Sequence, residues 1–196
     1  MSITNTIYSQ LAVTLPSPTT DFSGKTIIVT GANVGLGKEA VRHFVRLHAQ
    51  KVIIAVRSIA KGEAAKAEIE AQTQVTGVLE VWEVDYASYD SIKAFAARVA
   101  TLDRVDAVLL NAAVATEQFE MVEGNERTIT VNVISSTLLT LLLLPVLRSS
   151  AAQWGIVPVI AVVNSEVHAF TKFPERKTPN SLATLNNEKT AVMSDR

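Results

Sequence analysis

The chain has 196 residues and a net charge of −1, with 48% hydrophobic and 19% charged residues, a balance typical of a globular domain with a buried core. No basic stripe or polybasic run indicates binding to nucleic acid or anionic lipid, so we expect neither nucleic acid nor a membrane as a partner. The chain has no cysteine, which excludes disulfides, thiolate metal sites and cysteine nucleophiles, and we expect no metal site.

Residues 1–24 are predicted to form an extended leader, because Pro16 and Pro18 stand among serine and threonine residues. This stretch has neither a basic n-region nor a continuous apolar h-region, so it lacks the pattern of a signal peptide. We therefore expect a cytoplasmic protein.

Apolar strands alternate with helical patterns from residue 25 to residue 170. Strands are expected at 27–29, 51–56, 78–84, 105–110 and 157–163. Helices are expected at 36–47, at 59–72 with Ser58 as N-cap, at 88–101, and within 124–150, ending near Arg148. Near-continuous apolar strands separated by helices indicate a parallel sheet covered on both faces. The predicted fold class is α/β, a doubly wound Rossmann-type sheet of about five strands, followed by a loop-rich segment at 171–196.

The most apolar segment is 138–147, which includes Thr140 and Pro145. A membrane-spanning helix needs about 20 predominantly apolar residues, which is more than this segment contains. The segment is therefore interpreted as a buried helix of the domain.

A glycine-rich turn, Thr30-Gly31-x-x-x-Gly35-x-Gly37, joins the first strand to the first helix. Backbone N–H groups at a helix N-terminus are unpaired and the helix dipole favours an anion, so the turn predicts a phosphate site. One glycine would permit the tight turn, one the approach of a pyrophosphate and one the packing of the helix on the strand. The turn residues expected to bind the cofactor are Gly31, Asn33, Gly35, Leu36 and Gly37.

The position that commonly selects between NAD(H) and NADP(H) carries no carboxylate. About 20 residues beyond the turn, where an acidic residue often binds the ribose hydroxyls, the chain has Val56 and Arg57. A guanidinium can hold a 2′-phosphate with two hydrogen bonds, whereas a carboxylate would repel it. Arg57 therefore favours NADP(H); the alternative is a solvated arginine at the end of a strand.

The spacing T-G-x-x-x-G-x-G resembles the cofactor turn of the short-chain dehydrogenase/reductase family, and the resemblance covers about residues 20–196. It implies that Asp85, after the third strand, meets the adenine. It also implies that Asn111 and Ala112, after the fourth strand, lie near the adenine ribose. Ala113 stands where the N-A-G pattern of the family usually has glycine.

The resemblance also implies catalytic positions. Asn132, in the long helix, matches an asparagine that helps to order the catalytic lysine and a water. Ser165, after the fifth strand, matches a serine that hydrogen-bonds the substrate oxygen. The S-x-x-H run from Ser165 to His168 resembles the retinol-dehydrogenase-like branch, which implies a small lipophilic alcohol or carbonyl as substrate.

The general acid or base of this family is a tyrosine followed four residues later by a lysine, at least about 13 residues after the serine. The three tyrosines of this chain are Tyr8, Tyr86 and Tyr89, so none follows Ser165. Tyr89 and Lys93 have the Y-x-x-x-K spacing, but we interpret them as surface residues of the third helix, on the adenine side. The resemblance thus implies a chain truncated before this motif, whose fifth strand is an apolar sheet edge.

Three functions remain open. The first is an NADP(H)-dependent oxidoreductase of a lipophilic alcohol or carbonyl, active or inactive as this chain. The second is a non-catalytic dinucleotide-binding protein or dimer partner in a homo- or hetero-oligomer, favoured by the missing tyrosine and lysine. The third is a nucleotide- or methyl-donor-binding protein of another Rossmann family, disfavoured by the turn spacing, by Arg57 and by the order of Asn111, Asn132 and Ser165.

Overall fold

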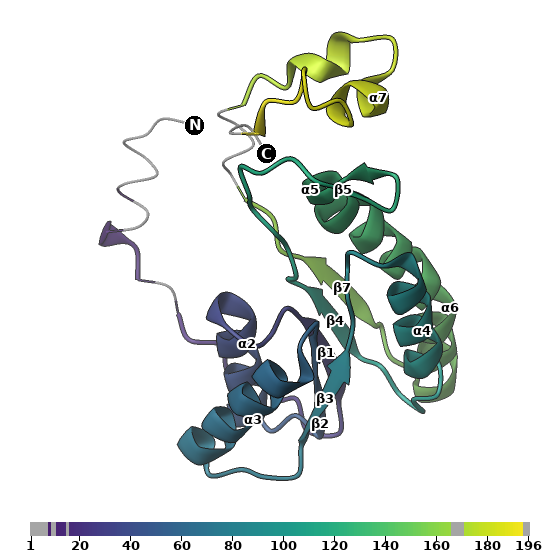
Figure 1. Cartoon of the computed structure of the whole chain (residues 1–196). Helices are drawn as coiled ribbons and strands as arrows, with labels where there is room; N and C mark the ends of the chain where they lie inside the picture. The colour runs from purple at the N-terminus through teal and green to yellow at the C-terminus, as the bar shows by residue number, and fades with distance from the viewer. Residues whose placement is uncertain (1–7, 9–10, 15, 166–170, 194–196) are drawn as a thin grey trace.

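The computed structural model describes residues 8, 11–14, 16–165 and 171–193 (Figure 1). Its main sheet has five strands, all parallel, in the order β3-β2-β1-β4-β7. These strands are β1 (Thr26–Thr30), β2 (Lys51–Val56), β3 (Leu79–Glu83), β4 (Ala107–Leu110) and β7 (Val159–Val162). The predicted Rossmann-type sheet is confirmed, and its order reverses direction between β1 and β4.

Helices cover both faces of the sheet (Figure 1). One layer consists of α2 (Gly35–Arg46) and α3 (Ile59–Thr73), and the other of α4 (Tyr89–Val99) and α6 (Ser136–Trp154). Successive residues of a strand point to opposite faces, so Ile27 and Val29 enter the core under α2, whereas Ile28 enters the core under α4 and α6. Phe22 packs against the core under α2. Its ring lies edge-on to the ring of Phe44, with the two ring centroids 5.0 Å apart.

The helices after β2 and β3 begin at serines. Ser58 Oγ accepts a hydrogen bond from the backbone N–H of Lys61 at 3.5 Å, so the predicted N-cap of α3 is confirmed. Ser88 caps α4 in the same way, accepting from the N–H of Ser91 at 3.2 Å. Both caps lie at the carboxyl end of the preceding strand, and they fix where each helix leaves the sheet.

The long helical segment has more parts than predicted. A hairpin of β5 (Met121–Val122) and β6 (Asn125–Glu126) leads into α5 (Arg127–Ile129), a π-helical turn η1 (Thr130–Ser135) and then α6. The helix ends at Trp154 rather than near Arg148, because Gly155 adopts the left-handed conformation, with φ of 61°, that terminates helices.

The segment after residue 170 is not loop alone. It contains a 3₁₀ helix, η3 (Pro174–Lys177), and a short α-helix, α7 (Ser181–Leu185). Asn180 Oδ1 accepts from the N–H of Ala183 at 2.9 Å and so caps α7. The side chain of Asn186, just after α7, accepts from the N–H of Glu126 and donates to Asn125 Oδ1, both at 2.8 Å. These tertiary contacts hold a helix too short to show a sequence period.

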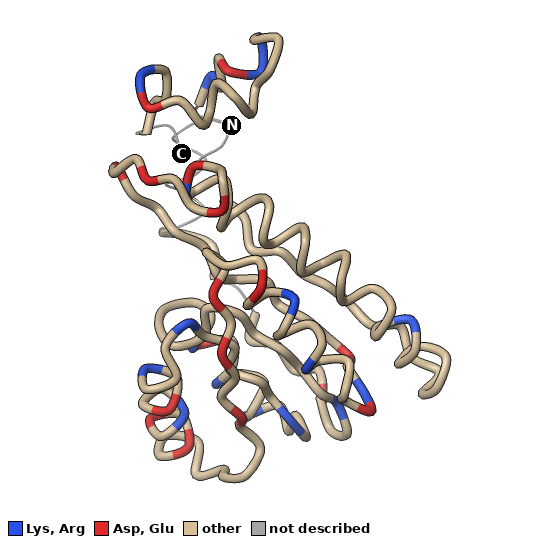
Figure 2. The backbone as a smooth tube through the Cα atoms, turned by 45° about the vertical axis from the view of Figure 1, so that its right-hand side comes forward, with Lys and Arg blue, Asp and Glu red and all other residues tan. Residues whose placement is uncertain are grey.

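The prediction of a buried apolar helix holds for only one face of α6. Leu139 and Leu143 have no exposed surface, whereas Leu141 is 58% exposed. Figure 2 shows that most of α6 carries no charged residue. By length and composition alone the run Arg127–Trp154 would be able to cross a membrane, but a third of its most apolar window is buried in the domain, and core helices pass the same test.

The last strand of the main sheet, β7, pairs with β4 and lies at the sheet edge, as expected. Val159 is 53% exposed and Val162 59% exposed. The sheet therefore ends in a partly exposed apolar strand, a type of edge on which other chains can pair.

We expect the buried face of α6 to contribute most of its stability. Replacing Leu143 with alanine should lower the free energy of unfolding by about 2–5 kcal/mol, because it leaves a cavity in the core under α4 and α6. The same change at the exposed Leu141 should cost less than about 1 kcal/mol. Urea unfolding of both variants measures the difference, and equal losses would contradict this assignment of faces.

Candidate functional site

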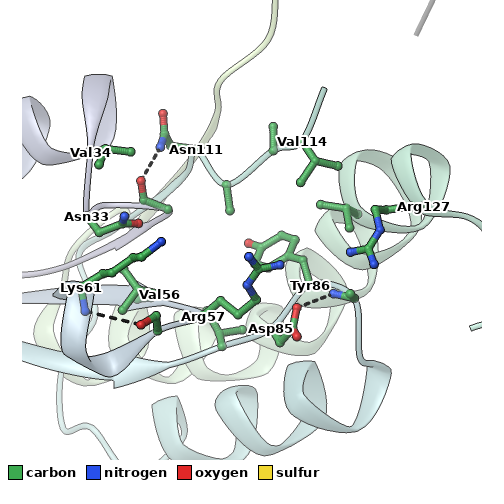
Figure 3. Close-up of a pocket in the computed structure, with 18 residues that line it drawn as sticks. Asn33, Val34, Val56, Arg57, Lys61, Asp85, Tyr86, Asn111, Val114 and Arg127 are labelled. Carbon is green, nitrogen blue, oxygen red and sulfur yellow. Dashed lines mark hydrogen bonds between the residues drawn. The ribbon is translucent and has the colours of Figure 1, made fainter. Parts of the chain in front are cut away.

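A cavity of about 360 Å³ opens where the carboxyl ends of β1 to β4 meet (Figure 3). It lies beside the point between β1 and β4 where the strand order reverses, the usual ligand position in open α/β sheets. The predicted cofactor residues that line it are Gly31, Asn33, Arg57, Asp85, Asn111 and Ala112. Gly35, Leu36 and Gly37 belong to the same turn but do not line the cavity, and neither do Asn132 and Ser165.

The three glycines of the turn meet different surroundings. A Cβ on Gly31, which has a φ of 66°, would lie 2.8 Å from Ala112 Cα. A Cβ on Gly37 would lie 2.7 Å from the carbonyl oxygen of Gly31 and 2.5 Å from Asn111 Nδ2. Gly35 has a φ of 57° and nothing within 4 Å of such an atom. The first and third glycines thus allow close packing, and the second shapes an open turn.

The hydroxyl of Thr30 joins the ends of β1 and β4. Thr30 has no exposed surface, and its Oγ1 accepts the N–H groups of Asn111 and Ala112, both at 3.0 Å. In addition, Asn111 Nδ2 donates to the carbonyl oxygens of Thr30 at 3.0 Å and Gly31 at 3.2 Å (Figure 3). The amide of Asn111 therefore builds one wall of the cavity.

Two cations face the cavity without a partner of opposite charge. Arg57 directs its guanidinium into the cavity from the end of β2, and Lys61 approaches from the first turn of α3 (Figure 3). Within the described part of the chain, no side chain hydrogen-bonds or pairs with either charged group. Sequence reasoning missed Lys61; its signal was its position one helical turn beyond Ser58, the N-cap that follows Arg57.

A third cation of the cavity is already neutralised. Arg127 Nε and Nη2 donate to the two carboxylate oxygens of Glu120 at 2.6 and 2.5 Å. Hydrogen bonds to Glu120 raise the pKa of the Arg127 guanidinium, and the same pair lowers the pKa of the Glu120 carboxyl. Of the three cations, Arg57 and Lys61 are therefore the ones open to an anion.

Asp85 lies at the end of β3 with its carboxylate only partly used. Its Oδ1 accepts the N–H of Ala87 at 2.9 Å, and its own N–H donates to Ser91 Oγ at 2.8 Å. These contacts hold the residue at the cavity, where the second carboxylate oxygen can accept from an amino group of a ligand.

Tyr86 is a cavity residue that sequence reasoning did not assign to the site. Its side chain is buried and its hydroxyl oxygen lies 3.2 Å from Thr30 Oγ1. Burial raises the pKa of Tyr86 to about 12, against a smaller lowering by the contact with Thr30, so the phenol is neutral at physiological pH. The signal was its place in Asp85-Tyr86, directly after the third strand.

The positions with predicted catalytic roles do not line the cavity, although Asn132 contacts Val114, which does. Asn132, in η1, hydrogen-bonds both backbone groups of Val114. Its Oδ1 accepts from the N–H at 2.9 Å, and its Nδ2 donates to the carbonyl oxygen at 2.8 Å. Ser165 follows β7 at an exposed position, and Asn164 Oδ1 accepts its N–H at 2.8 Å. His168 is outside the described residues.

The Y-x-x-x-K pair of α4 has the surroundings of surface residues. Lys93 Nζ pairs with Asp90 at 3.1 Å, and both side chains are mostly exposed. Neither Tyr89 nor Lys93 lines the cavity. The interpretation of this pair as ordinary helix residues is therefore confirmed.

We expect the Thr30 hydroxyl to contribute more to the free energy of unfolding than an ordinary side-chain hydroxyl does. Replacing Thr30 with valine leaves two N–H groups at the buried end of β4 without an acceptor, and we expect a loss of about 2–4 kcal/mol in the free energy of unfolding. Thr26→Val on the same strand is the matched control, since no described residue hydrogen-bonds its hydroxyl, and should cost under about 1 kcal/mol. Equal effects in chemical denaturation would refute the role of the Thr30 contact.

Comparisons with known proteins agree with this geometry. The model of the short chain dehydrogenase family matches residues 25–173. The chain is 50% identical over 189 residues to the short chain dehydrogenase/reductase dmxR8 of Cryptosporiopsis sp., covering 94% of this chain and 58% of that protein. It is 45% identical over 196 residues to the short-chain dehydrogenase anuD of Penicillium roqueforti, covering 100% of this chain and 51% of that protein. The chain thus spans little more than half the length of these curated relatives.

Solved structures give the same result. A short chain dehydrogenase of Escherichia coli CFT073, in complex with NADPH, superposes with a TM-score of 0.63 at 27% identity, covering 78% of this chain and 63% of that one. A short-chain dehydrogenase of Sphingobium yanoikuyae in complex with NADPH superposes with a TM-score of 0.62 at 25% identity, covering 76% and 57%. The chain therefore belongs to the short-chain dehydrogenase/reductase family, oxidoreductases that bind a nicotinamide dinucleotide and act on small molecules.

Proposed function

We propose that this chain binds NADP(H) in the cavity at the carboxyl ends of the strands. The observation that carries the proposal is the pair of unpartnered cations, Arg57 and Lys61, at the junction of β2 and α3. A guanidinium offers a planar pair of donors to a phosphate, and an ammonium adds a second positive charge beside it. A 2′-phosphate on the adenosine ribose satisfies both groups.

The turn after β1 offers a place for the pyrophosphate. Helix α2 starts after Val34, which gives it no side-chain cap, in contrast to the serine caps of α3 and α4. Its first N–H groups are thus left for another acceptor, and a phosphate is the acceptor that helix N-termini bind best. The open space at Gly35 leaves room for it.

The remaining contacts fit the adenosine. The second carboxylate oxygen of Asp85 is available to the adenine amino group, and Asn33 and Ala112 line the same cavity, where they can contact the ribose. When bound, the cofactor would supply the redox chemistry, giving a hydride to a carbonyl carbon or taking one from an alcohol carbon. In the proposed reaction Ser165 hydrogen-bonds the substrate oxygen and Asn132 orders the catalytic groups, with a small lipophilic alcohol or carbonyl as substrate, as in the retinol-dehydrogenase-like branch.

A second candidate function is non-catalytic dinucleotide binding, alone or as the partner of another subunit. The observation that favours it is the absence of a tyrosine after Ser165 in the sequence. Tyrosine with a nearby lysine is the general acid or base of the family, and hydride transfer to a carbonyl needs a proton donor. NADPH consumption with a panel of lipophilic ketones and aldehydes separates the two: binding without turnover supports the second function, and turnover supports the first.

The cofactor preference is tested by charge reversal at Arg57. We expect Arg57→Asp to raise the Kd for NADPH by about 10- to 100-fold, because a charge-assisted contact of about 1.5–3 kcal/mol is replaced by repulsion. The Kd for NADH, which has no 2′-phosphate, should change by less than about threefold. Titration of both cofactors by fluorescence measures this.

Arg148→Asp is the matched control, since it reverses an exposed arginine of α6 outside the cavity. It should leave the Kd of both cofactors unchanged. An equal loss of NADPH and NADH affinity in Arg57→Asp would contradict a 2′-phosphate site at this residue.

A further inference from the structure

We propose that Tyr86 donates its phenolic O–H to the adenosine of the bound dinucleotide, at an adenine ring nitrogen or at the ribose 3′-oxygen. The inference rests on the proposed function, because it requires the dinucleotide in this cavity. It concerns a buried hydroxyl that no other part of the proposed site uses.

The position of Tyr86 makes it part of the cavity floor. It directly follows Asp85 after β3, and its ring lies at the bottom of the cavity, between Arg57 and the loop after β4 (Figure 3). The residue is only 5% exposed, so the hydroxyl is removed from bulk water. A buried hydroxyl is destabilising unless its proton has an acceptor.

Thr30 does not accept that proton, as a count of its lone pairs shows. A hydroxyl oxygen has two lone pairs and one proton. Both lone pairs of Thr30 Oγ1 are taken by the N–H groups of Asn111 and Ala112, each at 3.0 Å. The 3.2 Å contact between Thr30 Oγ1 and Tyr86 Oη must then use the proton of Thr30. Tyr86 Oη is therefore the acceptor in this contact, and its own proton points elsewhere.

Within the described part of the chain, Tyr86 Oη has no second hydrogen-bond partner. The proton does not leave by ionisation, because burial raises the pKa of Tyr86 to about 12. Tyr86 lines the cavity, which is where an acceptor for this proton can enter. A ligand atom with a lone pair is the acceptor that completes this chain of hydrogen bonds, which runs from the N–H groups of Asn111 and Ala112 through Thr30 to Tyr86.

The neighbours of Tyr86 identify the part of the ligand. Asp85 precedes it in the chain, Arg57 lies above it at the end of β2, and Gly31 and Ala112 flank Thr30. These are the residues proposed to surround adenine, the 2′-phosphate and the adenosine ribose. The acceptor therefore belongs to the adenosine half of the dinucleotide, and Tyr86 has no contact with the nicotinamide half.

The test compares Tyr86→Phe with Tyr89→Phe, which removes a hydroxyl outside the cavity. Calorimetry measures the binding of NADPH, of adenosine 2′,5′-bisphosphate and of nicotinamide mononucleotide. We expect Tyr86→Phe to raise the Kd for NADPH and the Kd for the bisphosphate by the same factor, about 5- to 10-fold. The mononucleotide affinity should not change, and Tyr89→Phe should leave all three unchanged.

A purely structural role for Tyr86 is separated by ligand analogues that each lack one acceptor. These are the 1-deaza, 3-deaza, 7-deaza and 3′-deoxy forms of adenosine 2′,5′-bisphosphate. We expect one of them to bind the wild-type protein about fivefold more weakly than the parent, but to bind Tyr86→Phe as well as the parent does. Parallel losses in both proteins for all four analogues would overturn the proposal, as would unchanged affinity of the bisphosphate for a folded Tyr86→Phe. Failure of the wild-type protein to bind the bisphosphate at all would instead refute the proposed function and the inference with it.

Discussion

The hydroxyl of Thr30 is the contact on which the cavity depends. It accepts two N–H groups at the end of β4, and it does so from a strand whose side chains are all buried. Together with the amide of Asn111, which donates to the carbonyl oxygens of Thr30 and Gly31, this buried oxygen joins the ends of two parallel strands at the cavity. Gly31 and Gly37 follow from this closeness, because a Cβ at either position would collide with the backbone or with Asn111.

The charge around the cavity is arranged by helix starts as much as by side chains. Ser58 caps α3, whose first turn carries Lys61 to the cavity that Arg57 also lines, whereas α2 begins without a side-chain cap. Arg127 also lines the cavity, but its guanidinium pairs with the carboxylate of Glu120, so its charge is neutralised within the protein. The site thus separates cations that build structure from cations that are open to an anion.

Most of the residues expected to bind a dinucleotide line one cavity, whereas the positions with expected catalytic roles do not line it. Asn132 is engaged with the backbone of Val114, and Ser165 is exposed beyond an edge strand. The edge strand and the outer face of α6 both expose apolar side chains, with Val162 and Leu141 both more than half exposed. In a chain that spans about half the length of its relatives, the cavity at the strand ends and an apolar sheet edge thus occur together.

Local pattern was enough to predict the alternation of strands and helices, the N-cap at Ser58 and the glycine turn, because each depends on residues close in sequence. It was enough to point to Arg57, which follows its strand at a fixed distance from the turn. The contacts of Thr30, Tyr86 and Asn132 were decided only by the tertiary structure, since each side chain meets residues that are distant in the chain. The end of α6 and the formation of α7 were likewise decided by Gly155 and by the contacts of Asn186 with the β5–β6 hairpin. A sequence period records which face of an element is buried, but not which distant backbone group a polar side chain will meet.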